Sequence, residues 1–482
     1  MLPGLITWGF LAAMLILSLT FPIIVAYVVM FYTIYFVYEA ALTLTLMSIT
    51  SRKMQKVMST NWIEKLEEKK KLEHSNWEEI HHAVMICFAN EDYEILRPTV
   101  QLLADNNYPA EKKILVLATE ERIEKGFAIA TQLKHEFADG FLDIIITRHR
   151  LAPGEIIGKA SNENHGAREL YIYLKKKKID TRKVIITTND SDSRNNIWYM
   201  AKLTYEFLEQ DMPERRIYQP IPMFYNNIWT VPFFSRIIAT FSAQWQMSLA
   251  LKPHRYVNFS SYAMCMESLH AIGYWDPDII PEDERAYWKA VGLYGSDMRV
   301  VPLFIPVFLD AVKGRSLKRT FTEQYIQIRR WAWGASEVAY SMQTILKNPN
   351  VPVYLQYIYL FQQLRKSFEW AIAPFILLFG LSFPILVNPE FARSILAYSL
   401  PNILSKLLTI STVLMIAVFY LEAVFAPPKP TEWSFLRKGF SFLSWITFPF
   451  ISIVFSAIPA LDAQTRLLIG KPIQYIPTEK AH

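Results

Sequence analysis

The first 51 residues constrain the fold most strongly, because Glu39 is their only charged residue. The run at 4–47 contains no Lys, Arg or Asp. One helical crossing of a bilayer needs about 20 apolar residues, so this run is long enough for two crossings. Pro22 is the expected break between them, although one long tilted helix remains an alternative. We do not expect a secretory signal, because the run is too long and has no basic segment before it.

A second apolar region lies near the other end of the chain. Three candidate spans are found there, at 369–387, 404–425 and 440–458. Basic residues flank the polar middle of the chain on both sides: Arg52, Lys53 and Lys56 at its start, and Arg365 and Lys366 at its end. Basic residues favour the cytoplasmic side of a membrane. We therefore expect a multi-pass protein of the cell membrane whose middle part is cytoplasmic.

The polar middle, residues 52–365, has the composition of a soluble protein. The formal net charge of the whole chain is +6 over 482 residues. This mild excess suits an anionic membrane face or a phosphate-bearing ligand, and it does not call for nucleic acid as a partner.

Four short apolar runs in the middle part alternate with stretches that have helical spacing. The runs occupy residues 83–88, 113–118, 142–147 and 183–188. Runs this short, separated by helices, are typical of buried parallel strands in βαβ units. Ligands of such sheets bind beyond the carboxyl ends of the strands, so the residues that follow each run are candidates for a site.

Polar residues follow all four runs. In chain order they include Asn90, Glu91, Glu120, Glu121, Lys159, Asp190 and Asp192. Any one of these clusters fits a turn with helix-capping side chains, but four on one edge of a sheet favour a ligand site. Asp190 and Asp192 stand one residue apart and offer the oxygen ligands that Mg²⁺ or Mn²⁺ prefers.

Two further segments carry candidate chemistry. Glu282 and Asp283 follow Pro281, where they fit both a general base and an acidic helix start, two readings that are compatible. Farther along, Arg329 and Arg330 stand beside tryptophans just ahead of the second apolar region. Arginine binds phosphate and tryptophan stacks on sugars, but both residue types also anchor proteins at a membrane interface.

Together these segments resemble the motif series of membrane-embedded family 2 glycosyltransferases. In the cellulose, chitin and hyaluronan synthases the series is D-x-D, ED and Q-x-x-R-W, and here it is matched by residues 190–192, 282–283 and 327–331. Asn90 and Glu91 match the segment after the first strand. The resemblance covers residues 82–335. It implies an α/β domain of the GT-A type, flanked by transmembrane helices.

The resemblance also implies an activity and an acceptor. The activity is transfer, with inversion, of a sugar from a nucleotide-sugar donor at the cytoplasmic membrane face. The acceptor is a growing polysaccharide or another molecule, and Q-x-x-R-W favours the polysaccharide. A single-transfer glycolipid synthase is the alternative, and a degenerate, regulatory relative is a more distant one. A transporter is disfavoured, because Glu39 is the only clear ionisable residue deep in a span.

Residue roles are carried over from the same resemblance. Asp190 and Asp192 would hold Mg²⁺ or Mn²⁺ and the diphosphate, and Asp283 would be the base, supported by Glu282. The residues implied at the acceptor end and diphosphate are Gln327, Arg330 and Trp331. The residues implied in binding the nucleotide sugar are Asn90, Glu91, Glu120, Lys159 and Asp190. Arg329 and Trp333 have no role in the motif and are expected to be interfacial anchors.

Two departures from the family pattern matter. The family usually has an aspartate after the second strand, contacting the nucleotide, where this chain has Glu120 and Glu121. Residues 475–480 resemble the F-x-V-T-x-K gating loop of cellulose synthase, with Tyr475 in place of Phe. Such a loop must be cytoplasmic, whereas three C-terminal spans would place it on the opposite side. One of these two inferences must be wrong.

The sequence thus predicts six successive parts. These are N-terminal transmembrane helices at 1–50, a charged connecting helix at 51–81, the GT-A domain at 82–335, interfacial helices at 336–368, C-terminal transmembrane helices at 369–460 and a tail at 461–482.

Overall fold

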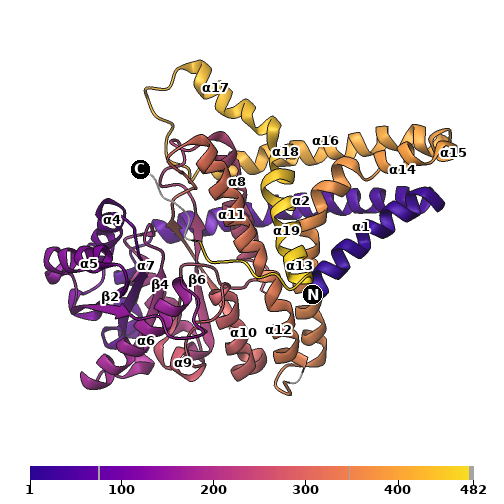
Figure 1. Cartoon of the computed structure of the whole chain (residues 1–482). Coiled ribbons are helices and arrows are strands. Elements are labelled where there is room, and N and C mark those ends of the chain that lie inside the picture. Colours follow the sequence, from indigo (N-terminus) through magenta and orange to yellow (C-terminus); the bar gives the residue numbers. More distant parts are fainter. Residues whose placement is uncertain (74–75, 254, 347, 477–482) are drawn as a thin grey trace.

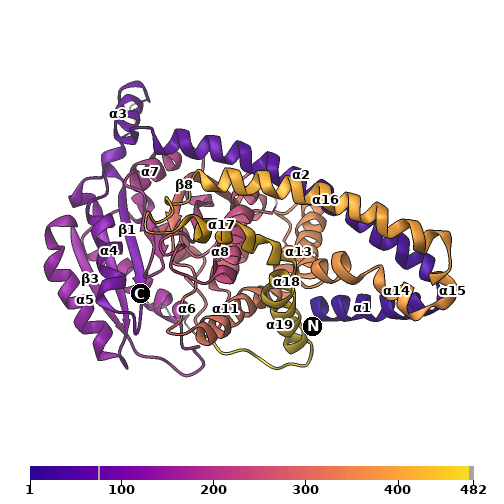
Figure 2. The ribbon, with the colours of Figure 1, turned by 90° about the horizontal axis from the view of Figure 1, so that it is seen from above.

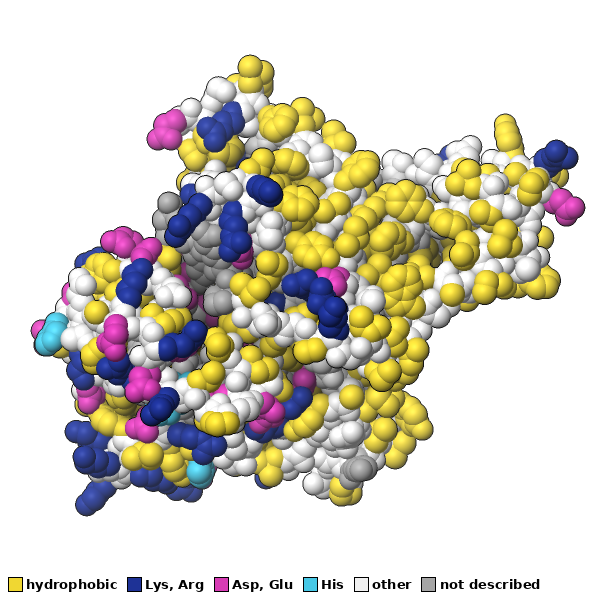
Figure 3. All heavy atoms as spheres, viewed as in Figure 1, with side chains coloured by type: hydrophobic (Ala, Val, Ile, Leu, Met, Phe, Trp, Pro, Cys, Tyr) yellow, Lys and Arg dark blue, Asp and Glu magenta, His cyan; other side chains and the backbone are white. Residues whose placement is uncertain are grey.

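The computed structural model describes residues 1–73, 76–253, 255–346 and 348–476. An α/β domain lies at one end of the molecule, and long apolar helices extend from it as an arm (Figure 1). The hydrophobic and charged side chains are segregated in the same way. Charged side chains gather over the α/β domain, whereas hydrophobic side chains cover most of the visible surface of the arm (Figure 3).

The sheet of the α/β domain has eight strands in the order β3-β2-β1-β4-β7-β6-β8-β5. The strands are β1 (His81–Cys87), β2 (Lys113–Glu120), β3 (Asp143–His149), β4 (Val184–Asn189), β5 (Arg194–Asn195), β6 (Arg216–Met223), β7 (Tyr262–Cys265) and β8 (Arg299–Phe308). The first four are the predicted strands, and all their pairings with one another are parallel, as predicted. Strand β7 is antiparallel to both of its neighbours, so the sheet is mixed.

Strands β6 and β8 were not predicted from the sequence. Each contains two prolines, Pro220 and Pro222 in β6 and Pro302 and Pro306 in β8. Proline cannot donate to a strand ladder and argues against a central strand. The structure accommodates the prolines by an irregular register between β6 and β8, which shifts between Gln219 and Ile221.

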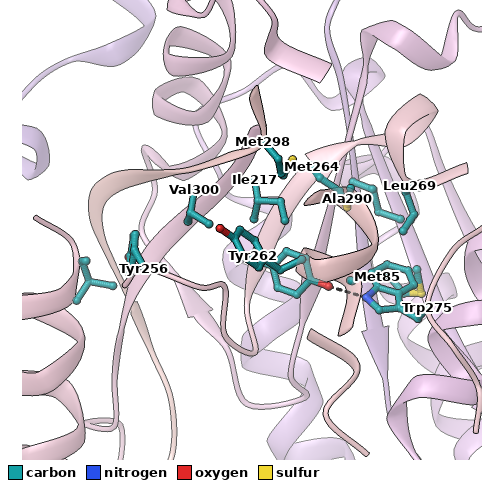
Figure 4. Close-up of a cluster of buried hydrophobic side chains, with 14 of the residues drawn as sticks. Met85, Ile217, Tyr256, Tyr262, Met264, Leu269, Trp275, Ala290, Met298 and Val300 are labelled. Atoms are coloured by element: carbon teal, nitrogen blue, oxygen red, sulfur yellow. Dashed lines mark hydrogen bonds between the residues drawn. The ribbon is translucent and has the colours of Figure 1, made fainter. Parts of the chain in front are cut away.

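Helices pack on both faces of the sheet. They are α3 (Trp62–Glu73), α4 (Tyr93–Ala104), α5 (Glu124–Glu136), α6 (Lys159–Lys176), α7 (Tyr199–Glu209), α8 (Phe233–Leu249), α9 (Met266–Ala271) and α10 (Glu282–Tyr294). The central strands are apolar throughout because both faces are covered: Met85 belongs to one buried cluster, and its neighbours Val84 and Ile86 to the other. In the first cluster Trp275 donates a hydrogen bond of 2.6 Å to the Tyr262 hydroxyl (Figure 4).

The arm is made of two helical hairpins that lie side by side (Figures 1 and 2). The first consists of α1 (Leu2–Thr20) and α2 (Pro22–Met58), so the predicted break at Pro22 is confirmed. The second consists of α13 (Val353–Phe379), α14 (Ser382–Val387), α15 (Pro389–Ala392) and α16 (Ile395–Ala423). Asn388 donates a hydrogen bond of 3.0 Å to the Leu19 carbonyl and joins the two turns at the tip.

The remaining helices connect the arm to the α/β domain. They are α11 (Leu317–Ala332), α12 (Glu337–Leu346), α17 (Phe435–Leu443), α18 (Phe448–Ser452) and α19 (Ile458–Leu468). By length and composition, three stretches of the described chain could cross a membrane: α1, α2 and residues 435–468. The third stretch differs from the others in direction, because α18 and α19 run crosswise to α2 and α16 in both views (Figures 1 and 2).

Candidate functional site

A cavity of about 1400 Å³ lies where the carboxyl ends of β1, β2 and β4 meet the helices of the arm. All the predicted site residues line this one cavity. They are Asn90, Glu91, Glu120, Lys159, Asp190, Asp192, Glu282, Asp283, Gln327, Arg330 and Trp331. Residues almost 250 positions apart in the sequence therefore converge on one space.

Lys159 is the cationic centre of the cavity. It begins α6, and its Nζ lies 2.9 Å from Asp190 Oδ1, 3.6 Å from Glu163 Oε1 and 3.7 Å from Glu282 Oε1. Burial alone would lower the pKa of Lys159, but the three carboxylates raise it well above its usual value of 10.5. The lysine is therefore held charged in a place with little access to water.

Glu163 belongs to this cluster, although the sequence analysis did not identify it. Its side chain is completely buried and accepts a hydrogen bond from the Thr188 hydroxyl. Burial raises the pKa of Glu163 to about 7, and Lys159 partly opposes the shift. The only sequence signal was its position one helical turn after Lys159, which also describes many surface ion pairs.

Glu282 and Asp283 form the first turn of α10, as predicted for an acidic helix start. Asp283 accepts hydrogen bonds from two backbone N–H groups, at 3.2 Å from Ser260 and 2.7 Å from Glu284. Burial raises the pKa of Asp283, and Lys159 together with these N–H groups opposes the shift. Burial and the charge of Asp283 raise the pKa of Glu282 from 4.5 to about 8. Glu282 therefore holds its proton to higher pH than an exposed glutamate does.

Asp190 and Asp192 stand on the turn after β4, opposite the acidic pair. Asp190 also accepts a hydrogen bond from the Ser260 hydroxyl, and Asp192 Oδ2 accepts one of 2.9 Å from the backbone N–H of Asp310. Ser260 therefore contacts both Asp190 and Asp283 and connects the two carboxylate groups of the site.

The fit of a metal ion can be judged from these carboxylates. No group of three or more His, Cys, Asp or Glu side chains within the described ranges is arranged to hold a metal ion. Mg²⁺ and Mn²⁺ are often held by one or two carboxylates, with phosphate oxygens and water completing the coordination. Asp190 and Asp192 fit that arrangement when a diphosphate is bound, and they do not form a closed metal site by themselves.

Three residues predicted to bind the nucleotide sugar line the part of the cavity next to β1 and β2. They are Asn90, Glu91 and Glu120. Glu91 is held in place by the Ala89 N–H at 2.8 Å and the Ser191 hydroxyl at 3.2 Å. Glu120 is buried at the end of β2 and is paired with Arg122. A carboxylate thus stands at the end of β2, already bound to an arginine.

The Q-x-x-R-W segment lies in the last turns of α11. Gln327, Arg330 and Trp331 are spaced three and four residues apart, which puts them on one helix face toward the cavity. Arg329 lies on another side of the helix, where its Nη1 is 3.0 Å from Asp462 Oδ2 in α19. Arg329 thus forms an ion pair between two helices, and its role as an interfacial anchor stays a prediction. Trp333 packs partly buried against the arm.

The C-terminal segment enters the same cavity. Tyr475 and Ile476 line it, and Arg330 donates a hydrogen bond of 2.9 Å to the Ile476 carbonyl. The Arg330 guanidinium also lies 4.9 Å from the centre of the Tyr475 ring. Gly158 allows the ring this close, because a Cβ there would be 2.8 Å from it. The rest of the gating-loop resemblance, residues 477–480, lies outside the described residues.

This placement is incompatible with three full crossings between the middle of the chain and its C-terminus. The third inferred span, 440–458, lies within a stretch, 435–468, that is long and apolar enough to cross a membrane. Its apolar residues pack against the protein: Phe455 stacks on Phe234 at 5.0 Å, and Ile451 joins the same buried cluster as Ile328. An apolar run long enough for a crossing can equally be explained by burial against neighbouring helices.

The comparisons with known proteins identify a family for the chain. The model of glycosyl transferase family group 2 matches residues 185–426, half of the chain. No curated protein matches the sequence. Among solved structures, the chain is similar to the mannosyltransferase PcManGT from Pyrobaculum calidifontis in complex with GDP-Man and Mn²⁺ (12% identity, TM-score 0.45, covering 80% of this chain and 97% of that chain). It is also similar to S. aureus TarS in complex with UDP-GlcNAc (11% identity, TM-score 0.36, covering 72% and 91%).

The sheet has the mixed α/β arrangement expected for a GT-A domain, with apolar helices on both sides of it in the sequence. The fold class and the enzyme class predicted from the motifs are thereby confirmed. The chain is a glycosyltransferase and belongs to glycosyl transferase family group 2.

Proposed function

We propose that the protein is an integral-membrane, inverting glycosyltransferase that moves a sugar from a nucleotide-sugar donor to an acceptor hydroxyl at the membrane. The observation that carries this proposal is the single cavity, in which Asp283 faces the same space as Asp190, Asp192 and Arg330. A base, a diphosphate-binding edge and an acceptor entrance are the three parts that such a transfer requires.

In the proposed reaction the acceptor hydroxyl loses its proton to Asp283. Its oxygen forms a bond to the anomeric carbon as the bond from that carbon to the diphosphate breaks, and the nucleoside diphosphate leaves with the electron pair. Asp283 suits this task because two backbone N–H groups fix its orientation. Glu282 supports it by holding a proton near neutral pH, which limits repulsion between the neighbouring carboxylates.

The donor diphosphate is proposed to lie between Lys159 and Arg330. Lys159 contacts Asp190 in the absence of donor, and the diphosphate would offer it additional negative charge. Mg²⁺ or Mn²⁺ held by Asp190 and Asp192 would neutralise the leaving group. Asn90, Glu91 and Glu120 on the rim are proposed to contact the nucleotide.

We further propose four membrane crossings, made by α1, α2, the pair α13 and α14, and α16. Both hairpin turns lie at the tip of the arm, so the α/β domain and the chain around Tyr475 are on the opposite, cytoplasmic side. Glu39 fits this arrangement, because Arg365 pairs with it at 2.8 Å and Lys252 at 3.4 Å. A paired carboxylate at the middle of α2 also argues against an ion-transport pathway.

The proposal is tested by incubating the purified protein with a panel of nucleotide sugars and Mn²⁺. We expect release of nucleoside diphosphate from one donor class, and loss of that release on removal of the metal ion with a chelator. An absence of turnover with every donor, in protein that is folded and inserted in the membrane, would favour the regulatory reading instead.

A further inference from the structure

The cavity has a second section, which the proposed donor chemistry does not use. This section lies between α8, α13, α16 and the segment of α17 and α18. Its lining includes Phe241, Leu378, Leu408, Ile416, Leu443 and Phe448. It is continuous with the section that contains Asp283, so a molecule lying in it can reach the proposed base.

The apolar section opens on the surface of the arm. Several of its lining side chains are well exposed: Phe241 is 44% exposed, Ile416 52% and Ile446 74%. They come from three different segments, α8, α16 and the chain after α17. Because α16 is proposed to cross the membrane, an opening bordered by these residues faces lipid chains.

Two hydroxyl groups in this section donate hydrogen bonds to their own helices. Thr412 donates to the Leu408 carbonyl at 2.9 Å, and Ser452 donates to the Pro449 carbonyl at 2.7 Å. A polysaccharide carries hydroxyl groups along its whole length, and each one taken out of water needs a hydrogen-bond partner. Hydrocarbon needs none and gains from burial. The lining therefore fits a hydrocarbon chain better than a sugar chain.

We propose that the acceptor is a membrane lipid with a free hydroxyl group, whose hydrocarbon part lies in the apolar section while the hydroxyl reaches Asp283. The sequence motifs favoured a growing polysaccharide, and this inference replaces that preference with the glycolipid alternative. It rests on the proposed function. The reaction is the transfer written above, with the lipid hydroxyl oxygen forming the new bond and Asp283 receiving the proton.

The test supplies a labelled donor to the purified protein in phosphatidylcholine vesicles that contain diacylglycerol, ceramide and a polyprenol. Vesicles of phosphatidylcholine alone are the control. We expect label in the organic extract of the first vesicles only. Label that appears in water-soluble or insoluble polysaccharide, with none in the extract, would overturn the inference and leave the proposed function standing. Absence of any donor turnover would instead count against the proposed function.

A pair of variants on one helix sharpens the test. Thr412→Trp places an indole inside the apolar section, whereas Val413 lies outside the cavity lining, is 61% exposed, and provides the control Val413→Trp. We expect Thr412→Trp to lower lipid labelling at least about tenfold, since fit in an apolar pocket is worth that much, and Val413→Trp to leave it unchanged. Ala373→Trp, in α13, repeats the block from another wall. Equal labelling by all three variants would contradict the proposal.

Discussion

Two parts of the cavity differ in the polar groups that line them. On the wall made by the strand ends, Glu163, Asp190 and Glu282 each lie within 4 Å of Lys159 Nζ. Burial raises the pKa of both Glu163 and Glu282, and Lys159 opposes these shifts. In the apolar section, the Thr412 and Ser452 hydroxyls donate to backbone carbonyls of their own helices. Charged groups gather at the strand ends, whereas the apolar section between α8, α13, α16 and α18 is lined mainly by aliphatic and aromatic side chains.

The largest effect is expected on the strand-end wall. Asp283→Asn should lower sugar transfer by about 10²–10⁴-fold, because a general base typically contributes that much, while donor binding survives. Transfer rates and donor affinity are measured on the same preparation. Asp278→Asn is the matched control, since Asp278 is exposed and lies five residues away. Near-normal transfer by Asp283→Asn would remove this residue from the mechanism.

A second change on the same wall concerns the metal ion. Asp192→Ala should abolish the increase in nucleoside diphosphate affinity that Mn²⁺ produces, because the diphosphate would lose its bridging cation. Calorimetry with and without Mn²⁺ measures this, and the exposed Asp139 provides a control as Asp139→Ala. If the variant kept the full metal dependence, Asp190 and Asp192 would be no more than a turn.

A third prediction uses two neighbouring arginines that face different parts of the molecule. Arg330→Lys should lower activity about tenfold or more, because lysine lacks the planar, forked guanidinium group of arginine. A loss of this size, about tenfold, is typical when a hydrogen bond from a charged group is removed. Arg329→Lys keeps a cation opposite Asp462 and should stay within about threefold of the parent. Membrane insertion of both variants is checked first. Equally small losses at the two positions would make the Q-x-x-R-W match a structural feature only.

The smallest effect is on stability and depends on pH. Since the pKa of Glu282 is raised from 4.5 to about 8, the folded protein binds a proton there that the unfolded chain releases. Stability should therefore fall as pH rises from about 4.5 to about 8. Glu282→Gln stays neutral and escapes this loss. The Tm difference between the variant and the parent should grow in favour of the variant across this window. A difference independent of pH would contradict the assigned pKa.

Each part of the fold could be predicted only where a local pattern was unambiguous. The parallel strands β1 to β4 were found because they are covered on both faces and therefore apolar throughout. Strands β6 and β8 were missed because their prolines are normally incompatible with a central position. The span at 440–458 stays a prediction, because apolar length does not distinguish a lipid environment from the side of another helix.

The candidate site, like the fold, could be predicted from the sequence only in part. Its residue types and their order were readable, because acids after a buried strand, an acidic helix start and Q-x-x-R-W are local features. Glu163, Ser260 and Tyr475 acquire their places only through contacts with residues from about 25 to 317 positions away, such as Thr188, Asp190 and Gly158. The sequence by itself determined which chemical groups the protein carries. Only the tertiary structure decided which of them share one cavity, because burial and charge interactions act through space and not along the chain.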